Sequence, residues 1–407
     1  AVVRDVGRVL GMSFNDVDQI AKLIPAELKI TLDTAIARVP ELQQMSKSRG
    51  DEGKLIEYAR KLEGMARHAS VHACAVIIAP SDLPDYVPLY RAAKDGTVTT
   101  QFVGETCMDV GLLKMDFLGL KELSLMDEAE RLIRIEEPDF VLDEVAWDDR
   151  PTFELFGRGE TIGVFQFESG GMREYLSKLR PDTLEDIIAM NALYRPGPME
   201  NIPSFIARKQ GKEEVRYPHP KLESILEPTY GIMVYQEQVM RIAQVLAGFS
   251  MGQADILRKA MGKKKPEEMA KVKKDFVGGC VEHGVDKKLA EDLFGDIEIF
   301  AGYAFNKSHA ACYSEVAYKN AYLKANYPRE YMSASLTMDR NNTERLTILL
   351  DDCRRMDIPV LPPDVNHSTL NFTPTAEGIR YGLSAIKNVG EGAAQSIVDT
   401  CVEEGAF

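Results

Sequence analysis

Apolar positions recur at helical spacing over most of the chain. In residues 1–63 apolar side chains return every three or four positions, which predicts a small group of helices. Asn15 and Thr31 stand where they can cap two of these helices, and a third is predicted over residues 52–65. The first part of the chain is therefore expected to be a small helical subdomain.

The pattern changes to strand-like runs between residues 70 and 120. Residues 72–79 form a short apolar run rich in β-branched side chains, and residues 97–102 follow an Asp-Gly turn. Residues 111–120 supply a third candidate strand. These segments are predicted to form one sheet.

The third strand carries an acid and a base on one face. With a period of two residues, Leu113, Met115 and Phe117 lie on one face. Lys114 and Asp116 project from the other face, roughly 7 Å apart. A sheet surface that merely faces water would show the same pattern. The functional alternative is a carboxylate metal ligand beside a cation that neutralises phosphate, which magnesium-dependent phosphoryl transfer needs.

From residue 121 to about residue 360 the helical period dominates. Residues 184–193 form one predicted helix, which ends at a loop with two prolines around a glycine. That rigid loop presents Arg195, as surface loops often do.

A second polar segment precedes a helix predicted over residues 313–327. It contains Asn306, Lys307, Ser308 and His309 in succession. Free N–H groups and the helix dipole favour an anion at such a helix start. A purely structural histidine is the alternative, and the sequence leaves it open.

The strongest charge feature is a basic segment in an acidic chain. The 407 residues carry a net charge of −14, but residues 254–274 hold eight cations against three acids, a net charge of +5, so the rest carries −19. Uncompensated cations repel one another, so this concentration indicates a polyanion partner, although a solvated helix face is the alternative. The acidic total does not exclude a basic cleft, because clefts focus the field independently of net charge.

Helix signals position these cations. Ser250 and Gln253 match a capping box, so a helix is predicted over residues 251–261, ended by Gly262, and Pro266 opens the next helix. Cations then gather at one polar edge of the first helix and in the connection after it: Arg258, Lys259, Lys263, Lys264 and Lys265.

Composition limits the class of protein. A hydrophobic content of 45% and a charged content of 28% are ordinary for a soluble globular protein of about two to four domains. No apolar run reaches membrane-spanning length and the first residues lack the features of a signal peptide, so a cytosolic protein is expected. The six cysteines include no CxxC pair and are expected to be reduced, buried thiols. The chain lacks an initiator methionine, which suggests a piece of a longer protein.

The last residues predict a DNA-binding motif. Residues 372–382 resemble two short strands, and two apolar helical stretches follow, joined by Gly390 and Gly392. In a helix-hairpin-helix, glycine N–H groups approach a DNA phosphate with no side chain in the way. A plain packing unit of two helices is the alternative.

Together these motifs resemble a known family. Their order is similar to that in the alpha, or catalytic, subunit of bacterial DNA polymerase III, the C-family replicative polymerase. The segments that carry the resemblance are RDVGRVLG, LLKMDFLGL, GVFQFES, ALYRPGP, TYGIMVYQEQVMRIAQ, ADILRKAMGKKKPEEMAK, AFNKSHA, YLKANYP and LPPDVN, and they extend over nearly the whole chain.

The resemblance implies an α+β multidomain fold that is mainly α. Residues 1–10 and 64–120 would belong to a palm, whose sheet is similar to that of polymerase-beta-like nucleotidyltransferases. Residues 11–63 would form a helical thumb, residues 121–370 a large helical fingers domain, and residues 371–407 the start of a helix-hairpin-helix region.

The resemblance also implies template-directed transfer of a deoxynucleotidyl group to a primer 3′-hydroxyl, with two Mg²⁺ ions at the site. Asp116 would be the catalytic metal ligand and Lys114 the cation beside it. Arg258 and Lys259 would bind the triphosphate of the incoming nucleotide, and His309 would pack near its sugar. The other expected contacts are nucleotide binding by Asn306 and Lys307, and DNA binding by Arg195, Lys263, Lys264, Lys265, Gly390 and Gly392.

Some positions depart from the family pattern. The family's other metal-binding aspartates and its glycine-serine triphosphate loop would lie upstream of Ala1. Val71, Cys74 and Ala75 stand where some relatives have a lysine and a glycine pair, and Lys259 stands where some have arginine.

Two hypotheses about function stay open. One is that the chain is part of an active polymerase, and the other is that it is a DNA- and nucleotide-binding module without catalysis. The implied partners are primer-template DNA and deoxynucleoside triphosphates and, in the full-length protein, the sliding clamp and other replisome subunits. The implied location is cytoplasmic and nucleoid-associated, with no membrane.

Overall fold

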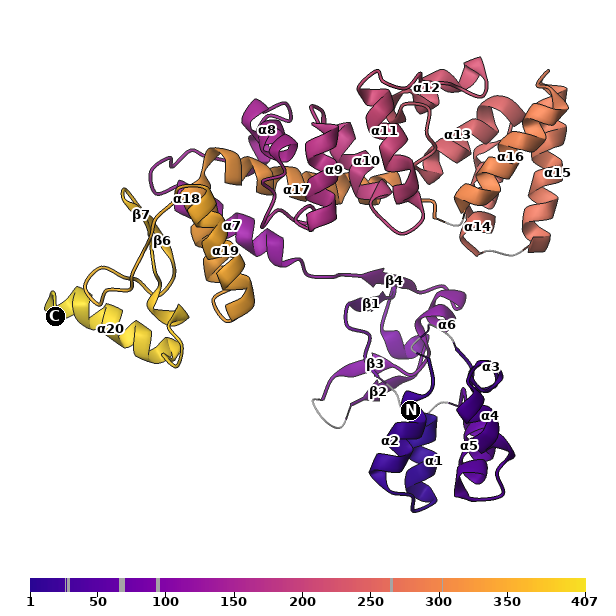
Figure 1. Ribbon diagram of the computed structural model, residues 1–407, viewed down its shortest axis with the longest axis horizontal. Helices are drawn as coiled ribbons and strands as arrows, with labels where there is room; N and C mark the ends of the chain where they lie inside the picture. The colour runs from indigo at the N-terminus through magenta and orange to yellow at the C-terminus, as the bar shows by residue number, and fades with distance from the viewer. Residues whose placement is uncertain (26, 28–29, 66–69, 93–95, 264–265, 302) are drawn as a thin grey trace. The chain divides into compact units, whose positions relative to one another are not determined.

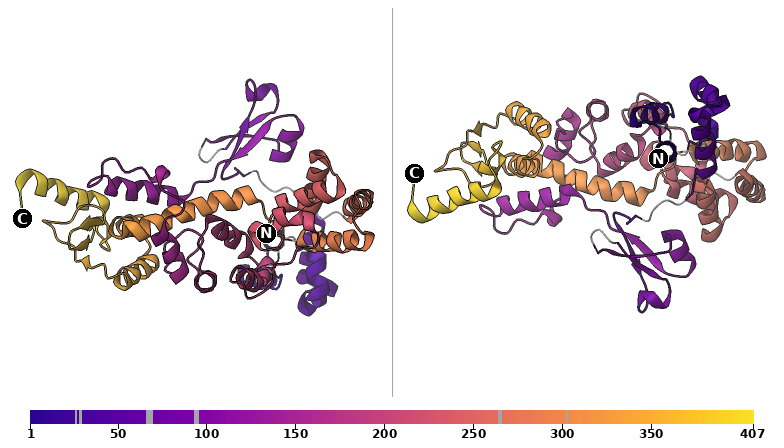
Figure 2. Two further views of the ribbon diagram at one scale, coloured as in Figure 1. Left: turned by 90° about the horizontal axis from the view of Figure 1, so that it is seen from above. Right: turned by 90° about the horizontal axis from the view of Figure 1, so that it is seen from below.

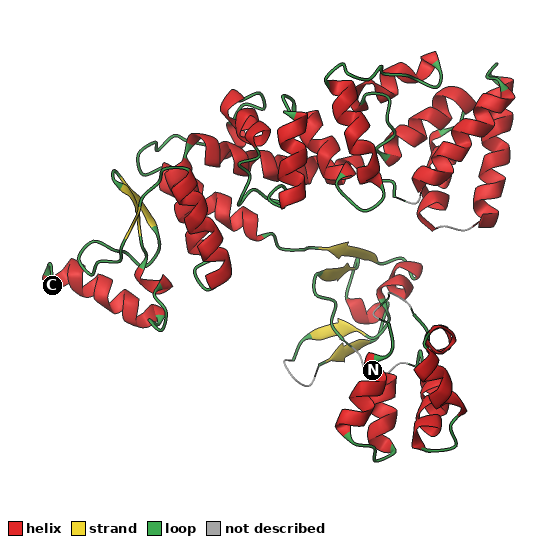
Figure 3. Ribbon diagram, in the orientation of Figure 1, coloured by secondary structure: helices red, strands yellow, loops and turns green. Residues whose placement is uncertain are grey.

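The computed structural model divides into two compact units, Ala1–Leu118 and Gly119–Phe407 (Figure 1). Most of the chain is helical and the strands are few and short, which confirms the mainly α character of the expected α+β fold (Figure 3). The structure describes residues 1–407 except 26, 28–29, 66–69, 93–95, 264–265 and 302, and it does not describe the side chains of residues 262–268. None of the described helices combines the length and apolarity needed to cross a membrane.

The first unit begins with short helices that share one core. They are α1 (Val2–Val9), α2 (Phe14–Lys22), α3 (Leu32–Arg38), α4 (Pro40–Lys47) and α5 (Asp51–Leu62). The predicted cap at Thr31 is confirmed, since its side chain accepts a hydrogen bond from Thr34 N, but Ser13 rather than Asn15 caps α2. The helix starts earlier because the Ser13 hydroxyl accepts from Asp16 N at 3.2 Å.

The core of these helices includes α1. Val3 and Val6 of α1 are buried with Val17, Leu32 and Leu55. Packing therefore joins the first ten residues to the helices that follow, whereas the resemblance grouped them with the sheet. The names palm and thumb stay predictions.

The strands of the first unit form two ladders instead of the single sheet that was expected. β1 (Ala75–Ile78) pairs antiparallel with β4 (Leu113–Asp116), and β2 (Leu89–Arg91) pairs antiparallel with β3 (Val98–Thr100). The helix α6 (Gly104–Asp109) precedes β4. All three predicted segments contain a strand, but β2 was missed, and β3 pairs with β2 because the two are neighbours along the chain.

The predicted apolar face of β4 lies on the surface of this unit. Val76 of β1 is opposite Met115 of β4, Ile78 is opposite Leu113, and all four side chains are exposed. Ile77, on the other face, packs against a small buried cluster instead. The face that carries Lys114 and Asp116 is therefore the better covered one.

The second unit is organised around its longest helix, α17 (Lys307–Asn326), which runs along the unit (Figure 2). It contacts α7 (Lys121–Ile133), α8 (Arg150–Arg158), α10 (Leu184–Leu193) and α18 (Pro328–Met338). The other helices are α9 (Gly170–Leu179), α11 (Ile202–Lys209), α12 (Glu223–Leu226), α13 (Gln236–Ala247), α14 (Met251–Lys263), α15 (Pro266–Glu282), α16 (Lys287–Ala301), α19 (Thr343–Arg355) and α20 (Glu391–Glu404). The prediction that residues 121–360 are mostly helical is confirmed.

A three-stranded sheet lies near the end of the chain. β7 (Gly378–Arg380) is central, parallel to β5 (Val360–Leu361) and antiparallel to β6 (Thr373–Thr375). Phe372 and Ile379 are buried in the same cluster as side chains of α7 and α18. The boundary expected at residue 371 therefore falls inside a packed sheet.

The helix-hairpin-helix prediction is only partly matched. The first of its two helical stretches forms only a 3-10 turn at Leu383–Ala385, and α20 follows after Gly390. The two predicted strands before it are confirmed as β6 and β7.

A buried ion pair joins α17 to α19. Lys324 has a side chain only 1% exposed, and its Nζ lies 2.6 Å from Oδ2 of Asp352. The same ammonium donates to the carbonyls of Glu160 at 2.8 Å and Ile162 at 2.7 Å. Burial lowers the pKa of Lys324, because desolvation outweighs the attraction of Asp352. Three acceptors thus hold one charge inside the protein.

Replacing Asp352 with alanine should strongly destabilise the second unit. The change leaves the Lys324 ammonium buried without its counter-ion, which typically costs about 3–5 kcal/mol of unfolding free energy. Trp147, the single tryptophan, packs against Tyr318 of α17 with the ring centroids 5.2 Å apart and the planes tilted by 43°, so its fluorescence during denaturant unfolding reports on this unit. Asp351→Ala is the matched control, because Asp351 pairs with Arg354 on the surface and should cost only about 0–1 kcal/mol. Equal losses in the two variants would contradict the assignment.

Candidate functional site

The acid and base predicted on β4 are in direct contact. Lys114 Nζ donates to both carboxylate oxygens of Asp116, at 2.8 and 2.7 Å, which confirms that the two side chains share a face. The ammonium of Lys114 lowers the pKa of the Asp116 carboxyl, and His72 and Cys74 add to that effect. Asp116 is half exposed and ionised, so it is a charged oxygen ligand open to solvent.

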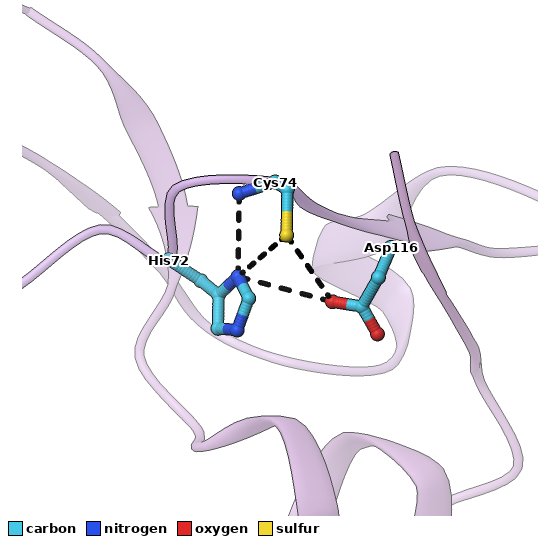
Figure 4. A group of neighbouring side chains, drawn as sticks. All are labelled: His72, Cys74 and Asp116. Carbon is cyan, nitrogen blue, oxygen red and sulfur yellow. Dashed lines mark hydrogen bonds and ion pairs between the residues drawn. The ribbon is translucent and has the colours of Figure 1, made fainter. Parts of the chain in front are cut away.

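Two further side chains stand beside Asp116, and the sequence did not assign them to the site (Figure 4). Cys74 Sγ lies 3.8 Å from Asp116 Oδ1 and 3.6 Å from His72 Nδ1. His72 Nδ1 lies 3.8 Å from the same Oδ1 and accepts hydrogen bonds from the backbone N–H groups of Cys74 and Ala75. The available signal was a histidine and a cysteine two residues apart at the start of the strand that pairs with β4.

The prediction that all cysteines are buried is wrong for half of them. All six are free thiols, and Cys107, Cys280 and Cys353 are buried as expected. Cys74 and Cys401 are only partly buried and Cys312 is exposed. Small and apolar residues next to these cysteines in the sequence do not bury their thiols. Burial depends on which other helices and strands pack against them.

The basic segment begins with the predicted capping box. Ser250 N donates to Gln253 Oε1 at 2.8 Å, and Gln253 N donates to Ser250 Oγ at 3.3 Å. α14 continues to Lys263, so the prediction that Gly262 ends the helix is wrong. A glycine in a helix costs only about 1 kcal/mol relative to alanine, which this packed helix tolerates. Pro266 opens α15 as predicted.

Arg258 and Lys259 share one carboxylate. Arg258 donates to Asp255 Oδ1 through Nε at 2.9 Å and Nη2 at 2.7 Å, and Lys259 Nζ lies 2.8 Å from Oδ2. Lys259 and then Arg258 lower the pKa of Asp255. Two cations against one acid leave one positive charge, so these cations are partly compensated and oriented, contrary to the expectation from sequence. The side chains of Lys263, Lys264 and Lys265 lie outside the described residues.

The polar groups at the start of α17 are already engaged. Asn306 Oδ1 caps the helix by accepting from His309 N at 2.8 Å. Lys307 N donates to Glu237 Oε2 at 2.9 Å, and Lys307 Nζ donates to Glu185 Oε1 at 3.1 Å. Carboxylates thus lie where the sequence predicted an anion site.

His309 presents an exposed ring beside other aromatic rings. Its centroid is 4.1 Å from that of Tyr313 with an interplanar angle of 31°, and 5.4 Å from that of Phe305. A stacked ring acts through its shape. The geometry suits packing against a flat or puckered ligand ring.

Arg195 points into the protein. Its guanidinium donates to the carbonyls of Ala192 and Tyr303 at 3.0 and 2.9 Å and lies 4.1 Å from the centroid of the Phe305 ring. Burial lowers the pKa of Arg195. These contacts hold the loop after α10 in place, so the geometry does not favour the DNA contact predicted for Arg195.

Gly390 and Gly392 lie at the start of α20. Gly390 is the N-cap and Gly392 is in the first turn. A Cβ at either position would meet open space, so another backbone can approach there. This openness is what the predicted phosphate contact requires.

Family models cover most of the chain. The model for the bacterial DNA polymerase III alpha NTPase domain matches residues 1–119, and the model for the bacterial DNA polymerase III alpha subunit finger domain matches residues 122–284. A helix-hairpin-helix motif model matches residues 357–407.

Curated relatives match along the whole chain. The chain is 47% identical over 407 residues to DNA polymerase III subunit alpha of Borreliella burgdorferi, and the match covers all of this chain and 35% of the relative. It is 45% identical over 420 residues to the protein of the same name from Escherichia coli K12, covering 36% of it, and 48% identical over 415 residues to that from Thermus aquaticus, covering 34% of it. The chain therefore belongs to the family of bacterial DNA polymerase III alpha subunits, and it spans about a third of the length of the curated relatives it matches.

Proposed function

We propose that this chain supplies part of the catalytic subunit of a bacterial replicative DNA polymerase, which adds deoxynucleotides to a primer 3′-hydroxyl under the direction of a template. The observation that carries the proposal is the contact of Lys114 with Asp116 on β4. It occurs in a chain that is 47% identical throughout to a protein named DNA polymerase III subunit alpha. A carboxylate held beside a lysine provides both a metal ligand and a cation for phosphate.

Asp116 is the proposed ligand for Mg²⁺ in this chain. Mg²⁺ bound there would activate the primer hydroxyl and neutralise charge on the leaving pyrophosphate. Within the described residues, the sole group of three potential ligands is His72, Cys74 and Asp116, which contains a single carboxylate. Mg²⁺ prefers oxygen ligands, so we propose that the remaining carboxylates of a two-ion site come from a further part of the polymerase.

Arg258 and Lys259 are the proposed ligands of the nucleotide triphosphate. Asp255 holds both cations at one edge of α14 and leaves a net positive charge there. A guanidinium with two N–H groups suits phosphate oxygens geometrically. His309 packs against the nucleotide sugar in this proposal, while Asn306 and Lys307 maintain the helix start that presents it.

DNA is the proposed partner of two other segments. Lys263, Lys264 and Lys265 follow the nucleotide-binding edge of α14 along the chain, and Gly390 and Gly392 offer open backbone at α20. In the longer protein we propose assembly with the sliding clamp and other replisome subunits on the chromosome in the cytoplasm. The exposed apolar face of β1 and β4 would there be covered by further strands, because two strands alone are seldom stable.

The chain by itself should not extend a primer. A single carboxylate, Asp116, cannot hold two Mg²⁺ ions, each of which needs several oxygen ligands. The purified 407-residue chain is compared with a mock preparation in a primer-extension assay at saturating nucleotide. Incorporation above the mock level would show that the proposed dependence on further carboxylates is wrong.

In a longer polymerase that contains this chain, Asp116→Asn should abolish incorporation and leave DNA affinity nearly unchanged. The substitution removes a charged metal ligand but keeps the size of the side chain and does not touch DNA in this proposal. Single-turnover incorporation and equilibrium DNA binding are measured on the same preparation. If the variant kept a tenth of the wild-type rate, the metal role would be excluded. Inactivity of the unaltered protein would instead favour a binding module without catalysis.

In the same longer polymerase, Arg258→Ala should chiefly weaken nucleotide binding. A charge-assisted hydrogen bond to phosphate contributes about 1.5–3 kcal/mol, so the nucleotide concentration for half-maximal incorporation should rise about ten- to a hundredfold. Lys273→Ala is the control, because Lys273 is a cation of α15 that pairs with Glu298 of α16. An unchanged nucleotide requirement, with a shallower dependence of DNA affinity on salt, would instead assign Arg258 to the DNA backbone.

A further inference from the structure

Three different donor atoms converge at the edge of the β1 and β4 ladder. They are Nδ1 of His72, Sγ of Cys74 and Oδ1 of Asp116, separated by 3.6, 3.8 and 3.8 Å. Figure 4 shows the imidazole, the thiol and the carboxylate turned toward one another. Their arrangement is set by the backbone, because Ala75 is opposite Asp116 in the ladder and Phe117 N donates to Cys74 O at 2.8 Å.

These separations match a tetrahedral metal site. Zinc binds sulfur at about 2.3 Å and nitrogen or oxygen at about 2.0–2.2 Å, so tetrahedral ligand atoms stand roughly 3.3–3.6 Å apart. The observed distances exceed that range by no more than a few tenths of an ångström. Small movements of exposed or partly exposed side chains therefore suffice to close the site around an ion.

The donor set favours a softer cation than Mg²⁺. A thiolate and an imidazole suit Zn²⁺ and Co²⁺, whereas Mg²⁺ requires oxygen ligands. The ionised thiol and carboxylate together balance the charge of a divalent cation. Three protein ligands leave a fourth position open to water, as in many zinc sites.

Groups around the site compete with the ion but do not exclude it. Lys114 Nζ bonds both oxygens of Asp116 and can stay on Oδ2 when Oδ1 binds a metal. His72 Nδ1 would give up its hydrogen bonds from the N–H groups of Cys74 and Ala75, which are 3.3 and 3.1 Å long. Those N–H groups are near solvent, so water can replace the imidazole as their acceptor.

We propose that His72, Cys74 and Asp116 form a binding site for Zn²⁺ or a similar borderline-soft divalent cation. The site uses the histidine and the cysteine of this chain and differs in chemistry from the proposed magnesium site, although the two share Asp116. The isolated chain is therefore expected to bind zinc whether or not the chain contributes to DNA synthesis.

The test is a titration of the reduced 407-residue chain with Co²⁺, followed by displacement with Zn²⁺. The wild-type chain should bind one Co²⁺ with a thiolate-to-cobalt charge-transfer band. Cys74→Ser should remove that band and weaken Zn²⁺ binding by at least about tenfold, since even residues that only support metal ligands contribute about ten- to a hundredfold. His72→Gln should keep the thiolate band at higher Co²⁺ concentration and weaken Zn²⁺ binding to a similar degree.

The matched control is Cys312→Ala, which removes an exposed thiol from the other unit and should change nothing. Loss of the band in this control, or equal Zn²⁺ affinity in the wild type and Cys74→Ser, would overturn the proposal. Absence of any thiolate band in the wild type would do the same. None of these measurements depends on polymerase activity, so a failure here is distinguishable from a failure of the proposed function.

Discussion

The buried contact of Lys324 with Asp352 constrains much of the second unit. It fixes α17 against α19 and, through the carbonyls of Glu160 and Ile162, against the loop after α8. Because α17 also packs on α7, α8, α10 and α18, its position determines where these helices lie. The other end of the same helix presents His309, so the placement of a candidate nucleotide contact depends on a charge buried about four helical turns away, at about 3.6 residues per turn.

Features determined by nearby residues could be predicted from the sequence. The caps at Thr31 and Ser250 involve residues three positions apart, and the shared face of Lys114 and Asp116 follows from the period of a strand. Contacts between distant segments could not be predicted in the same way. Arg195 bonds to Tyr303, 108 positions along the chain, and nothing near Arg195 in sequence indicates that its charge turns inward.

Strand pairing shows the same limit for the fold. The segments that contain β1, β3 and β4 were predicted from the sequence, but which strand pairs with which depends on the path of the chain between them. β2 and β3 are close in sequence, so pairing them loses less loop-closure entropy than pairing either one with a more distant strand. The pairing of β1 with β4 then brings Cys74 beside Asp116, 42 positions away, which explains why the sequence alone did not reveal the three-donor group.

In both candidate sites a carboxylate forms ion pairs with cationic side chains, but the net charge of the two clusters differs. At α14, Asp255 carries Arg258 and Lys259, so the cluster stays positive and suits a phosphate. At β4, the charge of Lys114 balances that of Asp116, so this pair is neutral and a further cation is not repelled by a net positive charge. The ratio of cations to acids therefore separates a surface suited to an anionic ligand from one suited to a metal ion.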